Sequence, residues 1–197
     1  DLSAATAATT RSPSKHTALF SSENSFRARS IGTLIHGALE ALDWSAELPA
    51  DIEQILASQH PRLSNDIEAS LQILRAALDE DLVTILDRHA TGVRLGLEDG
   101  DEIVLEKEVP FSCEMGADIL NGIIDRLVIL ERDGQPIAAE VIDFKTDQIS
   151  GSAQQTAEKH RDQLESYRSA VSRTWGIDPD SISTRIALVR SGEVVNL

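Results

Sequence analysis

The segment from residue 121 to residue 145 constrains the fold more than any other part of the chain. Two apolar runs rich in Ile and Val are joined by the turn-forming tetrapeptide Asp133-Gly134-Gln135-Pro136. This pattern predicts a β-hairpin with strands over about residues 117–130 and 137–145. Each run carries an acid, Asp125 and Asp143, in its apolar part, where a carboxylate is costly unless it has a partner.

The spacing of the second run points to metal chemistry. Side chains alternate along a strand, so Val141, Asp143 and Lys145 project to one face. An acid beside an ammonium group, with Asp125 on the neighbouring strand, can form a divalent-metal site, because Mg²⁺ takes one or two carboxylates plus water and phosphate oxygens. The alternative is a surface hairpin with an ordinary Asp–Lys salt bridge, since matches to such a short motif are common.

Composition limits the remaining classes. The 197 residues suit one domain with or without a tail, and no apolar run approaches the roughly 20 residues that span a bilayer, so no membrane partner is expected. Cys113 is the only cysteine, which excludes an internal disulfide, a cysteine-based zinc site and an iron–sulfur cluster held by cysteines, and favours a reducing cytoplasm. A formal charge of −15 argues against broad nucleic-acid binding by the domain alone.

The order of elements predicts an α/β domain. Residues 1–26, rich in Ala, Ser and Thr, read as a linker or flexible arm. Helical patterns follow, and from residue 101 the apolar period becomes alternating. We expect a small mixed β-sheet flanked by helices, with a helical part over about residues 27–95 and a sheet-containing core over about residues 100–197. The expected helices cover about residues 30–43, 49–60, 65–89 and 153–175, and the last strand covers residues 183–190.

Two helices carry further candidates. His36 lies at the edge of an apolar stripe, one turn after Gly32; a histidine in such a place is more often a packed residue than a ligand. Gln163 and Tyr167 are four residues apart and therefore neighbours on one helical face. They could hold a phosphate or stack on a base, or they could be a surface Gln beside a half-buried Tyr.

Taken together and in this order, the motifs resemble the PD-(D/E)XK nuclease domain of the RecB/AddA type, the nuclease module of helicase–nuclease subunits. The resemblance covers about residues 28–175 and implies a restriction-endonuclease-like core with an inserted helical segment. The matching segments are Gly32-Thr33-Leu34-Ile35-His36, Glu108-Val109-Pro110-Phe111, Gly122-Ile123-Ile124-Asp125-Arg126-Leu127, Val141-Ile142-Asp143-Phe144-Lys145-Thr146, and Gln163-Leu164 with Tyr167.

The resemblance implies a role for each matched residue. Mg²⁺ or Mn²⁺ would be bound by His36, Asp125, Asp143 and the backbone carbonyl of Phe144, and Lys145 would act with the two aspartates in catalysis. It also implies no iron–sulfur cluster, and a location in the bacterial cytoplasm. Four side chains are expected to contact DNA, and Glu108, ranked last, would assist through a water. The four are Gln163, Tyr167, Arg126 and Lys159.

The implied function is metal-dependent DNA cleavage of the exonuclease V type, in the processing of DNA ends for recombinational repair. DNA and a helicase domain or helicase–nuclease partner subunit are the expected partners. One alternative is a catalytically inactive nuclease-fold module that guides DNA or contacts a subunit. Another is an acidic α/β protein that binds protein partners through purely structural ion pairs.

Overall fold

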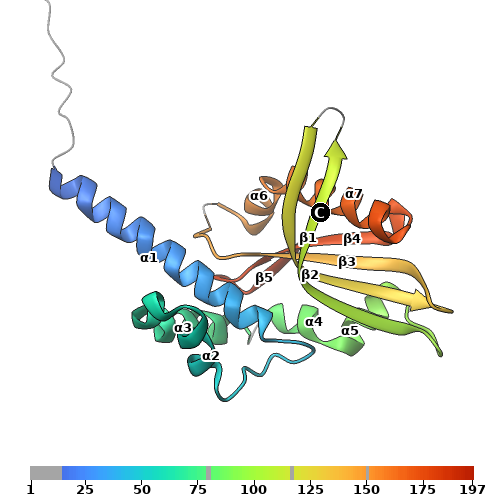
Figure 1. The fold of residues 1–197 in the computed structure, drawn as a ribbon, viewed down its shortest axis with the longest axis horizontal. Helices are drawn as coiled ribbons and strands as arrows, with labels where there is room; N and C mark the ends of the chain where they lie inside the picture. Colours follow the sequence, from blue (N-terminus) through green and yellow to red (C-terminus); the bar gives the residue numbers. More distant parts are fainter. Residues whose placement is uncertain (1–14, 79–80, 116–117, 150) are drawn as a thin grey trace, which may run out of the picture.

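The computed structural model of the chain describes residues 15–78, 81–115, 118–149 and 151–197. Its centre is a five-stranded mixed sheet in the order β1-β2-β3-β4-β5 (Figure 1). The β2–β3 hairpin pairs antiparallel as expected, β3 and β4 pair parallel, and the two outer pairs are antiparallel. The strands are β1 (Glu102–Met115), β2 (Asp118–Arg132), β3 (Gln135–Lys145), β4 (Ile182–Leu188) and β5 (Glu193–Asn196).

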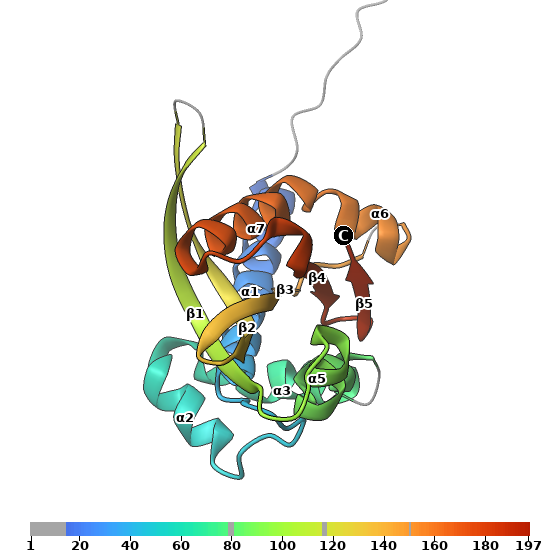
Figure 2. The same ribbon diagram turned by 90° about the vertical axis from the view of Figure 1, so that its right-hand side faces the viewer.

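Helices cover both faces of this sheet (Figure 2). One face packs on α1 (Lys15–Glu40), α2 (Ile52–Gln59), α3 (Ile67–Ala77), α4 (Leu82–Leu86) and α5 (Arg88–Leu95). The other face packs on α6 (Ala153–Glu158) and α7 (Arg161–Trp175), which form the crossover between the parallel strands β3 and β4. Two short 3₁₀ helices, Pro61–Asp66 and Pro179–Ser181, complete the described elements.

The alternation of β3 divides the core into two clusters. Ile142 and Phe144 pack with α1 and α3, whereas Val141 packs with α7. A strand buried on both faces reads as a continuous apolar run, and residues 139–144 are buried without a gap. The expected mixed sheet flanked by helices, consistent with a restriction-endonuclease-like fold, is confirmed.

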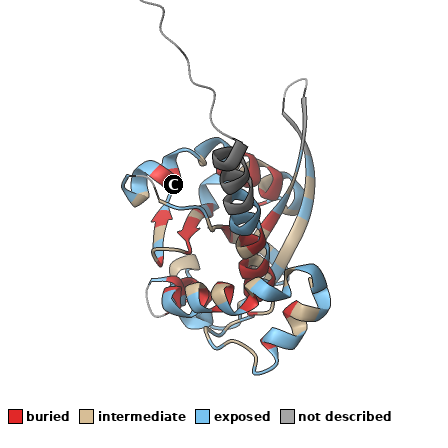
Figure 3. Ribbon diagram, turned by 90° about the vertical axis from the view of Figure 1, so that its left-hand side faces the viewer, coloured by how far each residue is buried: buried red, intermediate tan, exposed pale blue. Residues whose placement is uncertain are grey.

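Helix boundaries differ from the expected ones. The helix expected from Ser30 begins at Lys15, and Figure 3 shows that the buried residues described for α1 lie in its C-terminal half, from Ser30 onward. Of the arm expected over residues 1–26, residues 1–14 lie outside the described residues and the remainder belongs to α1, and the division of the chain at residue 26 stays a prediction. The helix expected over residues 65–89 is divided among α3, α4 and the start of α5. Asp87 separates the last two, because it adopts an extended conformation and caps α5 by accepting a hydrogen bond from the N–H of Ala90.

The helix expected over residues 153–175 is divided between α6 and α7. His160, with φ of −105°, lies between the two helices, and Ser152 caps the first of them in a capping box with Gln155. The strand β5 was not predicted, since four residues give too short an alternation to recognise.

Candidate metal centre

Three possible metal ligands from three elements meet beside the β1–β2 hairpin. His36 on α1, Glu108 on β1 and Asp125 on β2 each offer one ligand atom, and these atoms lie within 4.8 Å of one another. The Nδ1 atom of His36 is 3.8 Å from Oδ2 of Asp125. The side chains are half-buried, so the group is held by the core and remains open to solvent.

Gly32 allows α1 to approach the sheet closely enough to bring His36 there. A Cβ atom at this position would lie 2.8 Å from the Oγ1 atom of Thr146, which follows the last residue of β3. Any larger residue would therefore push the helix or Thr146 away. The bare backbone one turn before His36 fixes the distance between α1 and the end of β3.

Glu108 reaches the centre because of the hairpin register. Lys107 pairs with Arg126 and Val109 with Ile124, which places Glu108 opposite Asp125. Its φ of 50° lies in the left-handed region that non-glycine residues seldom adopt, and such backbone often occurs at functional sites. From the sequence, Glu108 was expected only to assist through a water. The register of the β1–β2 hairpin, which the sequence does not reveal, places it beside Asp125.

The two carboxylates of this group repel each other and are poorly hydrated. Burial is the main cause that raises the pKa of Asp125, followed by the charge of Asp143, although His36 opposes the shift. Burial also raises the pKa of Glu108, with the charges of Asp125 and Glu40 adding to it. Within the described part of the chain, neither carboxylate forms an ion pair with a lysine or arginine.

This donor set fits a hard divalent cation. One imidazole nitrogen and two carboxylate oxygens suit Mg²⁺ or Mn²⁺, which also take water and phosphate oxygens. The N–H of Phe144 donates to Oδ2 of Asp125 at 2.8 Å and orients that carboxylate. A bound cation would relieve the repulsion that raises both pKa values.

A second polar group adjoins the first on the α7 side of β3. Asp143 is buried, and its Oδ2 lies 2.7 Å from Nζ of Lys145, which donates to Oε1 of Gln163 at 3.1 Å. Gln163 donates from Nε2 to Oδ1 of Asp143 at 3.2 Å and also to the hydroxyl of Tyr167. The Tyr167 hydroxyl donates to the same carboxylate oxygen at 3.4 Å.

This network keeps Tyr167 protonated and Lys145 in one place. Burial, and then the charge of Asp143, raise the pKa of Tyr167. The ring of Phe111 packs edge-on against Tyr167, with centroids 5.3 Å apart. In the structure Gln163 and Tyr167 contact Asp143 directly, and the expected contact of these two side chains with DNA stays a prediction.

The structure thus divides the expected ligands between two adjoining groups. Asp143 is not within the 4.8 Å group, although its charge reaches Asp125 and raises the pKa of that residue. Its carboxylate is paired with Lys145 instead. Direct ligation by Asp143 and by the Phe144 carbonyl stays a prediction, as does contact between the exposed Lys159 and DNA.

Arg126 was wrongly expected to contact DNA. Its side chain is 1% exposed, and its guanidinium donates to the backbone carbonyls of Leu42, at 3.2 Å, and Asp43. The same group lies 5.1 Å from the ring centroid of Trp44. Arg126 therefore anchors the segment that follows α1 to the sheet, because an arginine on a buried strand face must find its acceptors inside the protein.

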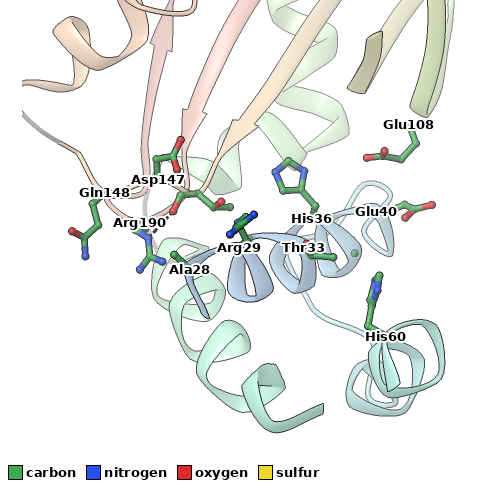
Figure 4. A pocket seen from close by; sticks show the side chains of 13 residues that line it. Ala28, Arg29, Thr33, His36, Glu40, His60, Glu108, Asp147, Gln148 and Arg190 are labelled. Carbon is green, nitrogen blue, oxygen red and sulfur yellow. Dashed lines mark hydrogen bonds between the residues drawn. The ribbon is translucent and has the colours of Figure 1, made fainter. Parts of the chain in front are cut away.

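A cleft of about 590 Å³ leads from the candidate metal centre along α1 (Figure 4). The figure shows His36 between Glu108 at one end and Asp147, Gln148 and Arg190 at the other. Its lining residues come from α1, from the end of α2, from β1, and from the segments after β3 and β4: Ala28, Arg29, Gly32, Thr33, His36, Gly37, Glu40, His60, Glu108, Thr146, Asp147, Gln148 and Arg190.

A comparison with protein families agrees with this arrangement. A model of the PD-(D/E)XK nuclease superfamily matches residues 13–194. A comparison with curated proteins finds no match for the chain. Among the described helices, none has the length and hydropathy needed to cross a membrane.

Proposed function

The chain belongs to the PD-(D/E)XK nuclease superfamily, and on that premise we propose that it hydrolyses phosphodiester bonds of DNA with the help of a divalent cation. The observation that carries the proposal is the meeting of His36, Glu108 and Asp125 within 4.8 Å at one end of an open cleft. Lys145 in the adjoining group supplies the cationic side chain that such a reaction needs.

His36, Glu108 and Asp125 would hold Mg²⁺ or Mn²⁺, with Asp143 and the Phe144 carbonyl completing the site. Bound there, the cation would lower the pKa of a coordinated water and neutralise charge on the scissile phosphate. His36 would bind the cation as a neutral imidazole, because a protonated ring nitrogen has no lone pair for a metal.

Lys145 is the catalytic side chain outside the ligand set. Asp143 and Gln163 fix its ammonium group, which leaves its remaining N–H to orient the attacking water or to donate to the developing negative charge. Tyr167 is a positioning residue, since it holds Gln163 and Asp143 in place. A DNA strand in the cleft would lie across the metal group and the end of β3.

We further propose that the domain is of the RecB/AddA type and acts on DNA ends, as an exonuclease V type nuclease of the bacterial cytoplasm. The order of its motifs supports this branch, as does Cys113 being the only cysteine, too few to hold an iron–sulfur cluster. The charge of −15 supports dependence on a helicase domain or partner subunit that feeds the strand into the cleft.

To test the proposal, the purified chain is incubated with end-labelled linear DNA and with circular single-stranded DNA, and cleavage is measured. We expect products with Mg²⁺ or Mn²⁺ and none with a chelator. Asp125→Asn and Asp143→Ala should each abolish cleavage and leave the circular dichroism spectrum unchanged. Full activity of either variant would remove the proposed mechanism.

Metal binding separates this function from an inactive module. Titration of the chain with Mn²⁺, followed by electron paramagnetic resonance, should show one site that Asp125→Asn removes. Binding without turnover on any DNA, with or without a helicase partner, would favour the inactive module that guides DNA.

A further inference from the structure

One face of α1 continues beyond the metal centre. Phe26, Arg29, Thr33 and His36 recur at helical spacing, so they lie along one side of the helix. A hollow of about 180 Å³ includes the first three of these residues, together with Ser30 and Leu63. It adjoins the large cleft, because Arg29 and Thr33 line both, and we call the two neighbouring hollows, which together extend from Phe26 to His36, the α1 groove.

Phe26 offers an aromatic face to solvent at the far end of this groove. This residue is 61% exposed, so a ligand can reach its ring. Arg29 follows one turn later, and its Nε donates to the backbone carbonyl of Ser25 at 3.2 Å. An exposed ring beside a guanidinium group on one helix face can stack on a planar group and bind an anion next to it.

Arg190 adds a second cation, fixed relative to the catalytic lysine. Its Nε donates to the backbone carbonyl of Thr146, the residue after Lys145, at 2.6 Å. Its terminal nitrogens have no hydrogen bond to any described residue, and Arg190 lines the cleft. Asp147 lies near this end as well, whereas Glu40 and Glu108 gather at the metal end (Figure 4).

We infer that this groove binds a single nucleic-acid strand, with an unpaired base stacked on Phe26 and backbone phosphates on Arg29 and Arg190. The inference rests on the proposed function and names its substrate class. Aromatic side chains that alternate with cations along a groove are typical of sites for single strands. A base inside a duplex is stacked on its neighbours and cannot offer its face to Phe26.

The arrangement also explains how a protein of acidic net charge can bind a nucleic-acid strand. Two arginines at fixed places bind phosphates locally although the net charge is −15, while stacking supplies affinity that salt does not screen. The strand would lie along α1 and bring its phosphodiester to the metal group beyond Thr33. Phe26 and Arg29 thereby determine which nucleotides of the strand reach the metal centre.

The test measures binding, so it does not depend on turnover. Fluorescein-labelled oligothymidylate is titrated with the chain in Ca²⁺, and in a second series in chelator, and anisotropy is recorded. Phe26→Ala should weaken binding by roughly 5- to 150-fold, which is the usual effect of losing one stacked base. Val93→Ala, at an equally exposed apolar residue on α5 outside the groove, is the matched control and should leave affinity unchanged.

An abasic strand of the same length isolates the stacking. The wild-type chain should bind it more weakly than oligothymidylate, whereas Phe26→Ala should bind the two strands equally. If Phe26→Ala weakens binding to both strands by the same factor, no base rests on the ring and the inference is overturned.

The arginines are tested by salt dependence. Arg29→Ala and Arg190→Ala should each reduce the slope of log K against log salt by about 0.7, the value for one phosphate contact on a single strand. Arg27→Ala is the control, because Arg27 lies two residues away on another side of α1 and pairs with Asp66 at 3.3 Å. Equal slopes for all three variants would overturn the assignment of the phosphates.

The two proposals can fail separately. If the chain binds strands through Phe26 and Arg29 and cleaves none of them, the groove stands and the proposed catalysis fails. If it cleaves DNA while Phe26→Ala leaves affinity for single strands unchanged, this inference alone is overturned, and Phe26 belongs to a surface for a protein partner.

Discussion

Strand β3 carries two buried carboxylates three residues apart, on opposite faces, and they have opposite surroundings. Glu140 is 0% exposed and faces the α5 side, where Arg94 donates to it at 2.7 and 3.0 Å and Arg185 at 2.5 Å. Asp143 faces α7 and shares its pocket with Lys145 and with neutral donors. Both carboxylate oxygens of Glu140 are therefore hydrogen-bonded to guanidinium groups.

The contrast is sharper at the neighbouring metal group. Asp125 and Glu108 lie close together, and among the described residues their one basic ion-pair partner is His36. Burial raises both pKa values, and the charge of a neighbouring carboxylate adds to each shift, that of Asp143 for Asp125 and that of Asp125 for Glu108. A buried acid with complete partners is structural, whereas acids that share too few partners indicate a binding site.

The largest expected effect is the loss of stability when the ion pairs of Glu140 are removed. Glu140→Ala leaves Arg94 and Arg185 without their carboxylate, and loss of one partner in a buried ion pair costs about 3–5 kcal/mol. Urea denaturation would measure the fall in the free energy of unfolding. The control is Glu165→Ala, whose exposed pair with Arg168 is worth about 1 kcal/mol or less. Similar losses in both variants would contradict the distinction.

The next effect concerns the catalytic group. Lys145→Ala should reduce cleavage by about 10²–10³-fold, since one donor to the transition state is lost. Binding of Mn²⁺ should persist, because Lys145 is not a ligand. Arg75→Ala, which removes an exposed cation from α3 outside the cleft, serves as the control and should cleave at the wild-type rate. Wild-type cleavage by Lys145→Ala would place the catalytic cation elsewhere.

A smaller effect is the stabilisation of the folded chain by Mn²⁺, which should depend on the metal group and not on the ion pairs of Glu140. At a Mn²⁺ concentration about 100-fold above Kd, ligand binding should stabilise the wild-type chain by about 2.7 kcal/mol. The same increment is expected in Glu140→Ala, because its ion cluster does not touch the metal group. Asp125→Asn should show none. Thermal unfolding with Mn²⁺ and with chelator would measure all three, and a response that Asp125→Asn retains would contradict the ligand assignment.

The smallest effect is a pH dependence of the metal-free chain. Because the folded state raises the pKa of Asp125, it binds more protons than the unfolded state between the ordinary and the raised value. The Asp125 contribution therefore disfavours folding near pH 7 and is relieved as pH falls through the raised pKa. In chelator, Asp125→Asn should be more stable than wild type at about pH 7, and the difference should shrink towards about pH 4. A difference that grows as the solution is acidified would contradict this sign.

Local periodicity was enough to predict much of this protein. Alternation along residues 137–145 placed Asp143 and Lys145 on one face, and helical spacing placed Gln163 beside Tyr167; the structure has both arrangements. The ordered motifs also pointed to the nuclease superfamily that the family model matches. Such features depend on neighbours within a few residues, and a strand or helix fixes those by itself.

Tertiary structure alone decided which acids share a site. His36, Glu108 and Asp125 come from three elements, and their distances depend on the contact of Gly32 with Thr146 and on the register of the β1–β2 hairpin. Arg126 is buried and therefore cannot contact DNA as the sequence led us to expect. The structural role of Glu140 likewise became visible only from its ion pairs with Arg94 and Arg185. Sequence periodicity determines the direction of a side chain relative to its own element, but only the packing of elements determines what it meets there.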